Sequence, residues 1–299
     1  MAAGLGAGGS RVAGILLVAA SALVFSLTGV LTKLIASDVW TIACWRGLLG
    51  GAAILLYVLW CRRGRPAGPG LRLGWRGWLL ASVGSLASLA FIAAFKLTYV
   101  ANVAVIFATA PFMAAALEWL ALRERLRPAT LLAAVVAVLG VIVMVSGGVG
   151  SDRLLGDALA LLMTFGSALY MVLIRAFHDT PVVLAGGVSG LQLFVVGWIV
   201  VDPLAVSFED AVLLTLFGLS FALAVVLWTE GNRRITAAET ALLGSAETPF
   251  AILLAWLILA ELPPAMSFVG GAIVLCAVLA HVLRDLVRAS VAQRADVRG

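Results

Sequence analysis

The chain has 299 residues, of which 63% are hydrophobic and only 12% are charged, and its mean hydropathy is +1.14. Globular proteins carry about 25% charged residues, so water alone cannot solvate a folded form of this chain, and a soluble enzyme is excluded. The net charge is +5, but the arginines fall at the ends of apolar stretches rather than along one polar face. This pattern excludes a nucleic-acid footprint.

Apolar stretches of about 20 residues, enough to span a hydrocarbon core of about 30 Å, recur along the chain. We expect an all-α integral membrane protein with ten transmembrane helices. They lie at 12–35, 40–60, 76–98, 102–122, 129–147, 154–176, 181–201, 210–229, 236–260 and 265–284. Thr236-x-x-Glu239 is a capping box at the start of the ninth helix. No linker leads to a separate soluble domain.

The basic residues divide unequally between the two ends of these helices. Of the 20 lysines and arginines, Lys33, Lys96 and Arg153 lie on one side and Arg46 lies inside a span, whereas all the others lie on the side of the termini. Loops rich in Lys and Arg stay in the cytoplasm. We therefore expect both termini, and the loop at 61–75, to be cytoplasmic.

The chain also repeats itself. Pro111-Phe112 in the fourth helix recurs as Pro249-Phe250 in the ninth, and each pair is followed by an acid just past its helix, Glu124 or Glu261. Further matches are Gly14 and Lys33 with Gly156 and Arg175, and Gly47-x-x-x-Gly51 with Gly186-x-x-x-Gly190. Each half holds five spans, an odd number, so the halves enter the membrane in opposite directions. Inverted repeats of this kind are typical of secondary transporters.

We therefore divide the chain into two inverted five-helix repeats between two short tails. The tails are a cytoplasmic N-terminal one at 1–11 and a C-terminal one at 285–299, and the repeats are 12–147 and 154–284.

These features resemble the EamA-type metabolite exporters of the drug/metabolite transporter superfamily, over roughly 12–284. The matching stretches are Lys33, Arg46, Lys96-Leu97-Thr98-Tyr99 leading to Pro111, Ala237-Ala238 leading to Pro249-Phe250, Glu261 and Gly270-Gly271. The resemblance implies ten helices in two repeats, a location in the bacterial inner membrane and a small-molecule solute. No catalytic residue, cofactor or metal site is expected, and the partners are the solute and the lipid bilayer, with the chain a monomer or a weakly associating dimer.

Polar groups inside the spans are the candidate site residues. Glu247 falls near the bilayer middle, beside a proline kink, where a carboxyl is costly unless it faces a polar cavity, a base or a proton. Arg46 could hold an anionic substrate group or lock the outer gate, and a pair between helices fits equally well. We expect the solute between the halves near the kinks at Pro111 and Pro249. The expected substrate-binding residues are Tyr99, Asn102, Phe107, Thr109, Trp228, Glu247 and Thr248.

The expected function is export of small metabolites by alternating access, with amino acids, including aromatic ones, as the leading substrates. Efflux of drug-like organic cations anchored by Glu247 is the alternative, and nucleotide-sugar carriage is a weaker third option. Proton antiport through Glu247 and uncoupled diffusion both fit the sequence. Gly187-Val188-Ser189-Gly190 and His281 superficially imitate an intramembrane serine protease, but their depths along the helices differ too much for a nucleophile and its base.

Overall fold

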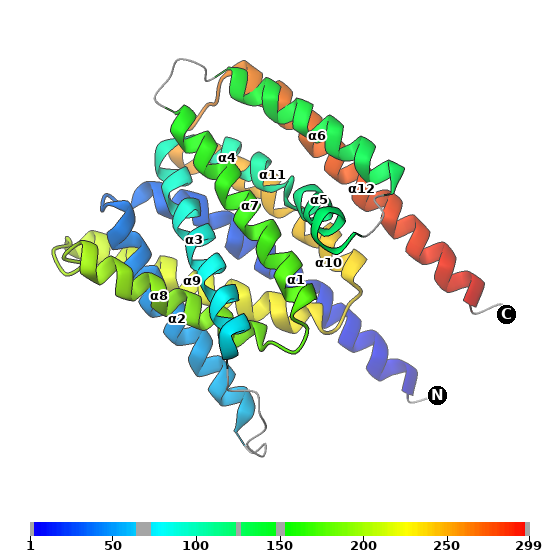
Figure 1. Cartoon of the computed structure of the whole chain (residues 1–299), viewed down its shortest axis with the longest axis horizontal. Coiled ribbons are helices and arrows are strands. Elements are labelled where there is room, and N and C mark those ends of the chain that lie inside the picture. The colour runs from blue at the N-terminus through cyan, green and yellow to red at the C-terminus, as the bar shows by residue number, and fades with distance from the viewer. Residues whose placement is uncertain (1–2, 64–72, 124–126, 148–152, 297–299) are drawn as a thin grey trace.

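The computed structural model describes residues 3–63, 73–123, 127–147 and 153–296. The elements of this part of the chain are all α-helices (Figure 1), as the sequence predicts. They are α1 (Ala3–Leu34), α2 (Val39–Arg62), α3 (Gly74–Leu97), α4 (Val100–Phe107), α5 (Ala110–Leu122), α6 (Pro128–Ser146), α7 (Leu154–Ala176), α8 (Val182–Val200), α9 (Phe208–Asn232), α10 (Ala237–Gly244), α11 (Glu247–Leu259) and α12 (Ala265–Asp296).

These helices provide ten segments long and apolar enough to cross a membrane, the number expected from the sequence. Eight spans are single helices, whereas α4 with α5 forms one span and α10 with α11 forms another. Helices α1 and α12 are longer than expected, because each continues beyond its apolar span into the tail at its end of the chain. The chain is a multi-pass membrane protein.

Helix packing follows a two-fold pattern. Helix α2 packs against α8, and α6 against α12, so the second and the fifth span of each half meet their own counterparts. Helix α1 packs against α9, α10 and α11, and in the same way α7 packs against α3, α4 and α5. The amino end of α1 and the carboxyl end of α12 lie on the same side of the bundle (Figure 1). This pairing agrees with two inverted repeats of five spans.

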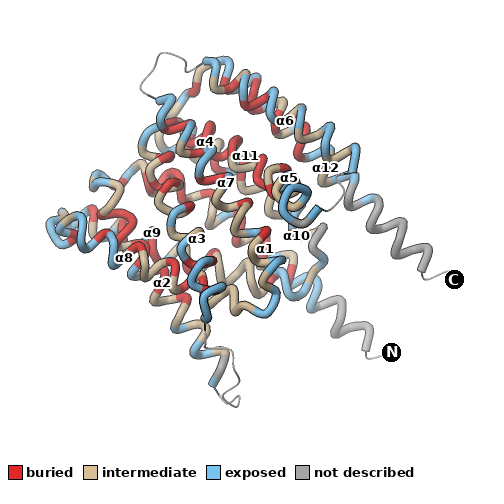
Figure 2. The backbone as a smooth tube through the Cα atoms, in the orientation of Figure 1, coloured by how far each residue is buried: buried red, intermediate tan, exposed pale blue. Residues whose placement is uncertain are grey.

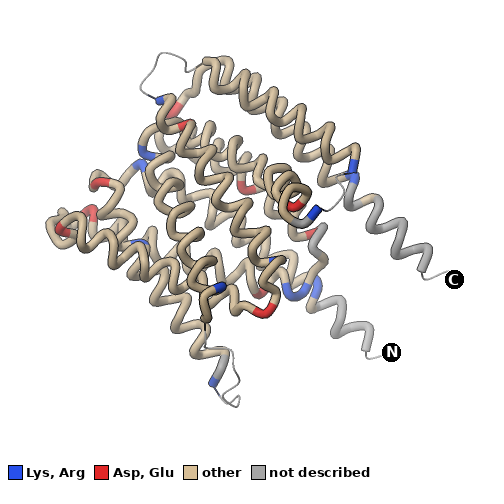
Figure 3. Tube along the Cα trace, in the orientation of Figure 1, with Lys and Arg blue, Asp and Glu red and all other residues tan. Residues whose placement is uncertain are grey.

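Burial is concentrated where helices face one another, and the outward faces are exposed (Figure 2). Large apolar side chains such as Trp60, Leu120 and Ile199 are 66 to 78% exposed, which suits a surface in contact with lipid rather than water. Lysines, arginines and acids lie mostly near the helix ends (Figure 3). The acids and bases farther inside are therefore the ones that need an explanation.

Two glycines matched in the sequence are also matched in the packing. A Cβ on Gly14 of α1 would lie 2.7 Å from side chains of Arg234 and Ile235, at the turn before α10. A Cβ on Gly156 of α7 would lie 2.7 Å from Thr98, at the turn before α4. Each glycine lets the first helix of one half approach the interrupted span of the other half.

Candidate functional site between the two halves

The two interrupted spans break at equivalent points. Helix α4 has 8 residues and α5 has 13, and α10 and α11 have the same two lengths. At each break an N–H bonds to the carbonyl three residues earlier, from Thr109 to Ile106 and from Ala246 to Leu243. Pro111 and Pro249 follow directly, and a proline has no N–H with which to continue the helix. At each kink expected from the sequence, a short turn whose backbone stays right-handed thus separates two α-helices.

A small cavity lies beside these breaks, between α1, α3, α4, α7 and α11. Its wall is largely aromatic, formed by Phe25, Phe91, Phe95 and Phe107, and its polar lining residues are Ser26, Glu247 and Thr248. Both halves of the chain contribute, because Phe25, Phe91 and Phe107 precede residue 147 and Glu247 follows it. A cavity shared by two halves is the arrangement that a solute site in a duplicated transporter requires.

Glu247 is the charged residue of this lining. It is the first residue of α11 and is half-buried. Among the described residues it has neither a hydrogen-bond nor an ion-pair partner. Its neighbour Thr248 is buried and donates to the carbonyl of Ala104 on α4, at 3.4 Å. Because a carboxyl inside a span costs about 2.5–3.5 kcal/mol on insertion scales, a partnerless Glu247 facing a cavity is a candidate binding group.

Arg46 lies behind the aromatic wall. Its side chain is buried, Nη1 donates to Ser88 of α3, and Nε has no partner. The guanidinium carbon lies 4.0 Å from the ring centroid of Phe221 and 5.3 Å from that of Phe91. Within the described ranges no carboxylate forms an ion pair with Arg46. Stacked rings and a hydroxyl thus hold a buried cation whose charge is not neutralised.

The structure divides the expected substrate-binding residues into three groups. Phe107, Glu247 and Thr248 line the central cavity. Tyr99 and Asn102 line a second cavity near the start of α4. Thr109 is buried at the break but bonds to the carbonyl of Ile106, and Trp228 packs against Gly244, so neither of these two residues lines the central or the second cavity.

Asp157 is a residue that the sequence reasoning missed. It is 1% exposed in the first turn of α7, and its Oδ1 accepts hydrogen bonds from Thr98 at 2.7 Å and from Asn102 at 3.1 Å. An acid inside an apolar span is itself a signal of a functional or structural site. Asp157 escaped notice because it lies close to the start of its span, where acids are common.

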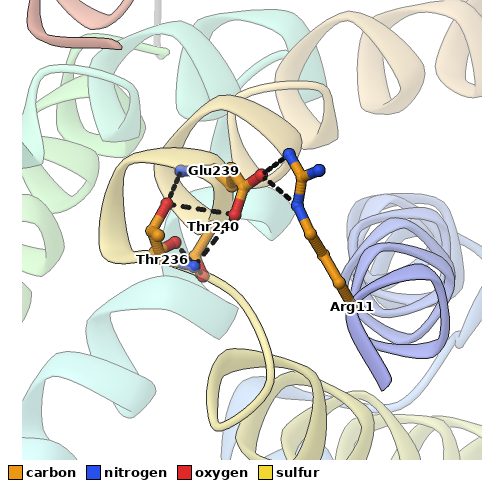
Figure 4. A network of polar contacts seen from close by, with 4 residues as sticks. All are labelled: Arg11, Thr236, Glu239 and Thr240. Atoms are coloured by element: carbon orange, nitrogen blue, oxygen red, sulfur yellow. Dashed lines mark hydrogen bonds and ion pairs between the residues drawn. The ribbon is translucent and has the colours of Figure 1, made fainter. Parts of the chain in front are cut away.

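Ion pairs tie the two halves together near the ends of the bundle. Arg11 of α1 pairs with Glu239 of α10 (Figure 4). The expected capping box is confirmed there, since the Thr236 hydroxyl accepts from the Glu239 N–H and Glu239 accepts from the Thr236 N–H. At the other end Glu261 pairs with Lys33, 3.3 Å away, and accepts from the N–H of Val100. The matching acid Glu124 lies outside the described residues.

Ser189 and His281 have different neighbours. Ser189 of α8 accepts a hydrogen bond from Ser85 of α3, whereas the ring of His281 on α12 lies 5.3 Å from the ring of Phe112. Helices α8 and α12 lie on opposite sides of the bundle in Figure 1. A nucleophile and its base must be within hydrogen-bond reach, so this arrangement does not support the protease alternative.

The chain is similar to known proteins in two comparisons. Residues 12–146 match the model of the EamA-like transporter family. A solved structure described as "Crystal structure of protein" is 19% identical, with a TM-score of 0.63 over 90% of this chain and 97% of its own. No curated protein sequence matches. The resemblance expected from the sequence is thereby confirmed: residues 12–146 resemble the EamA-like transporter family, and 90% of the chain shares its fold with the matched structure.

Proposed function

We propose that this protein is a secondary transporter of the bacterial inner membrane that exports small metabolites by alternating access, with amino acids, including aromatic ones, as its leading substrates. The observation that carries the proposal is the cavity at the two helix breaks, with Glu247 unpaired in its lining. Interrupted helices that meet near the bilayer middle are typical of solute sites in transporters with inverted repeats.

The chemistry of the cavity and its surroundings fits a zwitterion with an apolar side chain. Glu247 can accept from an ammonium group, and the rings of Phe25, Phe91 and Phe107 offer an apolar surface for the rest of the solute. The Arg46 guanidinium lies over the rings of Phe91 and Phe221. The Phe221 ring in turn meets that of Phe25 edge to face, with ring centroids 6.2 Å apart. The guanidinium does not line the cavity, so it would reach a substrate carboxylate only after these rings move apart.

The size of the cavity supports alternating access. Its volume of about 20 Å³ is close to the space that one water molecule needs. An amino acid would therefore enter only if the halves move apart. Ion pairs between the halves at both ends, Arg11 with Glu239 and Lys33 with Glu261, are suited to close one end while the other opens.

Efflux of drug-like organic cations is the alternative, and the lone carboxyl of Glu247 within an aromatic wall is the observation that favours it. The buried and unneutralised Arg46 argues against it, because a second cation near that guanidinium would be repelled. Amino-acid export accounts for both charges, whereas cation efflux accounts for one.

Purified protein in liposomes tests the proposal. We expect efflux of loaded amino acids, strongest for aromatic ones, and little efflux of an organic cation without a carboxylate, such as tetraphenylphosphonium. Repeating the assay with and without a pH gradient distinguishes proton antiport from uncoupled diffusion. Efflux of the organic cation with no efflux of any amino acid would establish the alternative instead.

A further inference from the structure

The second cavity lies at the end of the bundle away from the chain termini. It lies between the starts of α4, α7 and α12 and the end of α6, and it is lined by Tyr99, Asn102, Gly147, Arg153, Asp157, Pro264 and Ser267. Its volume of about 70 Å³ is larger than that of the central cavity. Some polar atoms of its lining residues take part in none of the ion pairs and hydrogen bonds described above.

Two buried oxygen atoms, on residues that line this cavity, lack partners. Asp157 is 1% exposed and Asn102 is 4% exposed. Asp157 Oδ1 is occupied by Thr98 and Asn102, but within the described part of the chain Asp157 Oδ2 and Asn102 Oδ1 are buried without any hydrogen bond. Buried acceptors without donors are unfavourable, so the site is suited to a ligand that brings several N–H donors and a positive charge.

A cation of the protein lies in the same cavity. Arg153 precedes Asp157 by one helical turn and is exposed, and the two side chains do not form an ion pair. The guanidinium instead lies 4.0 Å from the ring centroid of Tyr99 and donates to the Tyr99 hydroxyl. Among the described residues this is the one hydrogen bond that its nitrogens donate, whereas an arginine has five N–H donors. An anionic group at the mouth could therefore bind there.

We propose that this cavity is a second solute site, which binds the ammonium of an α-amino acid at Asp157 and Asn102 and its carboxylate at Arg153. This inference rests on the proposed function and adds to it an outer site, where the solute would bind after it leaves the central cavity. An inorganic cation would satisfy the two free oxygens but would leave the positive charge of Arg153 beside it. A zwitterion satisfies the oxygens and the guanidinium together.

Protection of an introduced cysteine tests this site without any transport. Ser267→Cys is made in a variant whose Cys44, Cys61 and Cys276 are replaced by alanine, and the reconstituted full chain is exposed to a small, membrane-impermeant methanethiosulfonate from outside. We expect phenylalanine to protect the Ser267→Cys protein at a concentration about tenfold or more below that needed for phenethylamine or 3-phenylpropanoate, since each analogue lacks one charge-assisted contact.

Two variants assign the contacts. In the Arg153→Gln protein, phenylalanine should protect at the same concentration as phenethylamine. In the Asp157→Asn protein, phenylalanine should protect at the same concentration as 3-phenylpropanoate. Arg153 is exposed, so its variant keeps the proposal testable if Asp157→Asn fails to fold. Arg127→Gln, another exposed arginine at a helix start, is the matched control and should leave all three concentrations unchanged.

The outcomes separate this site from the proposed function. Equal protection by the three compounds would overturn the zwitterion site. Protection by sodium chloride in place of choline chloride, with no amino acid present, would overturn it as well. Amino-acid efflux without protection overturns only this inference, and protection without efflux of any amino acid overturns only the proposed function. Glu247→Gln should abolish efflux while it leaves protection intact.

Discussion

Gly47 of α2 and Gly190 of α8 pack backbone against backbone. A Cβ on Gly47 would lie 2.4 Å from the carbonyl oxygen of Gly190, closer than any real contact of a Cβ. One turn further along α2, a Cβ on Gly51 would lie 2.9 Å from the carbonyl oxygen of Gly187. The second spans of the two halves therefore approach each other only because their facing positions lack side chains.

Gly47→Ala should destabilise the fold by about 1–3 kcal/mol, because an added methyl group forces two helix backbones apart. The thermal unfolding temperature of the purified protein in detergent measures this effect. Gly186→Ala is the matched control, since the nearest atom to its Cβ would be the Tyr170 hydroxyl at 4.0 Å. Equal unfolding temperatures for the two variants would show that the α2–α8 contact does not depend on glycine.

This contact also corrects a detail of the sequence interpretation. The pair Gly186-x-x-x-Gly190 was expected to match Gly47-x-x-x-Gly51, but Gly187 rather than Gly186 faces α2. Spacing alone shows that two glycines share a helix face, and it does not show how the helix is rotated against its neighbour. The rotation depends on the packing of every other side chain along the interface.

The ten spans and the breaks at Pro111 and Pro249 could be predicted because length, hydropathy and proline act locally. The cavity lining could be predicted only in part. Phe25 lines the cavity and Trp228 does not, yet both are aromatic residues in apolar spans, and lipid or a cavity wall would suit either. Glu247 stood out because a carboxyl in the middle of a span has few explanations.

Asp38 should stabilise α2 in a pH-dependent way. It caps the helix by accepting from the N–H groups of Trp40 and Thr41. Partial burial raises the pKa of the Asp38 carboxyl, but the hydrogen bonds from Thr41 and Trp40 outweigh this effect and leave the pKa below its ordinary value. The capping contribution is then complete above the ordinary pKa of an aspartate and is lost as the pH falls through the lowered one.

Asp38→Ala should therefore lower the stability by about 1 kcal/mol near neutral pH. The difference in unfolding temperature from the parent protein should shrink as the pH falls below the ordinary aspartate pKa of 3.8. Asp179→Ala is the control, because Asp179 is exposed and its contact with His178 is an exposed one that contributes little. A difference that grows in acid would contradict the capping role.

The unequal distribution of basic residues predicts the orientation in the membrane. In a cysteine-free background, a membrane-impermeant maleimide added from outside should label Asp152→Cys and Glu209→Cys but not Arg65→Cys. Glu209 is exposed in the first turn of α9, and positions 65 and 152 lie outside the described residues. Strong labelling at 65, with none at 152 or 209, would reverse the orientation.

Glu247→Gln should abolish most transport without unfolding the protein. Glutamine keeps the shape and hydrogen-bonding reach of the side chain but cannot carry a charge, so it can neither pair with a substrate ammonium nor release a proton. Because Glu247 has no partner among the described residues, its replacement breaks no ion pair, and the unfolding temperature should not fall. We expect the efflux rate of phenylalanine from liposomes to drop by about tenfold or more, the effect of losing one charge-assisted contact.

The matched control is Glu209→Gln, which replaces an exposed acid in the first turn of α9 and should transport normally. A Glu247→Gln protein with the parent's rate, solute preference and pH dependence would reduce Glu247 to a structural residue.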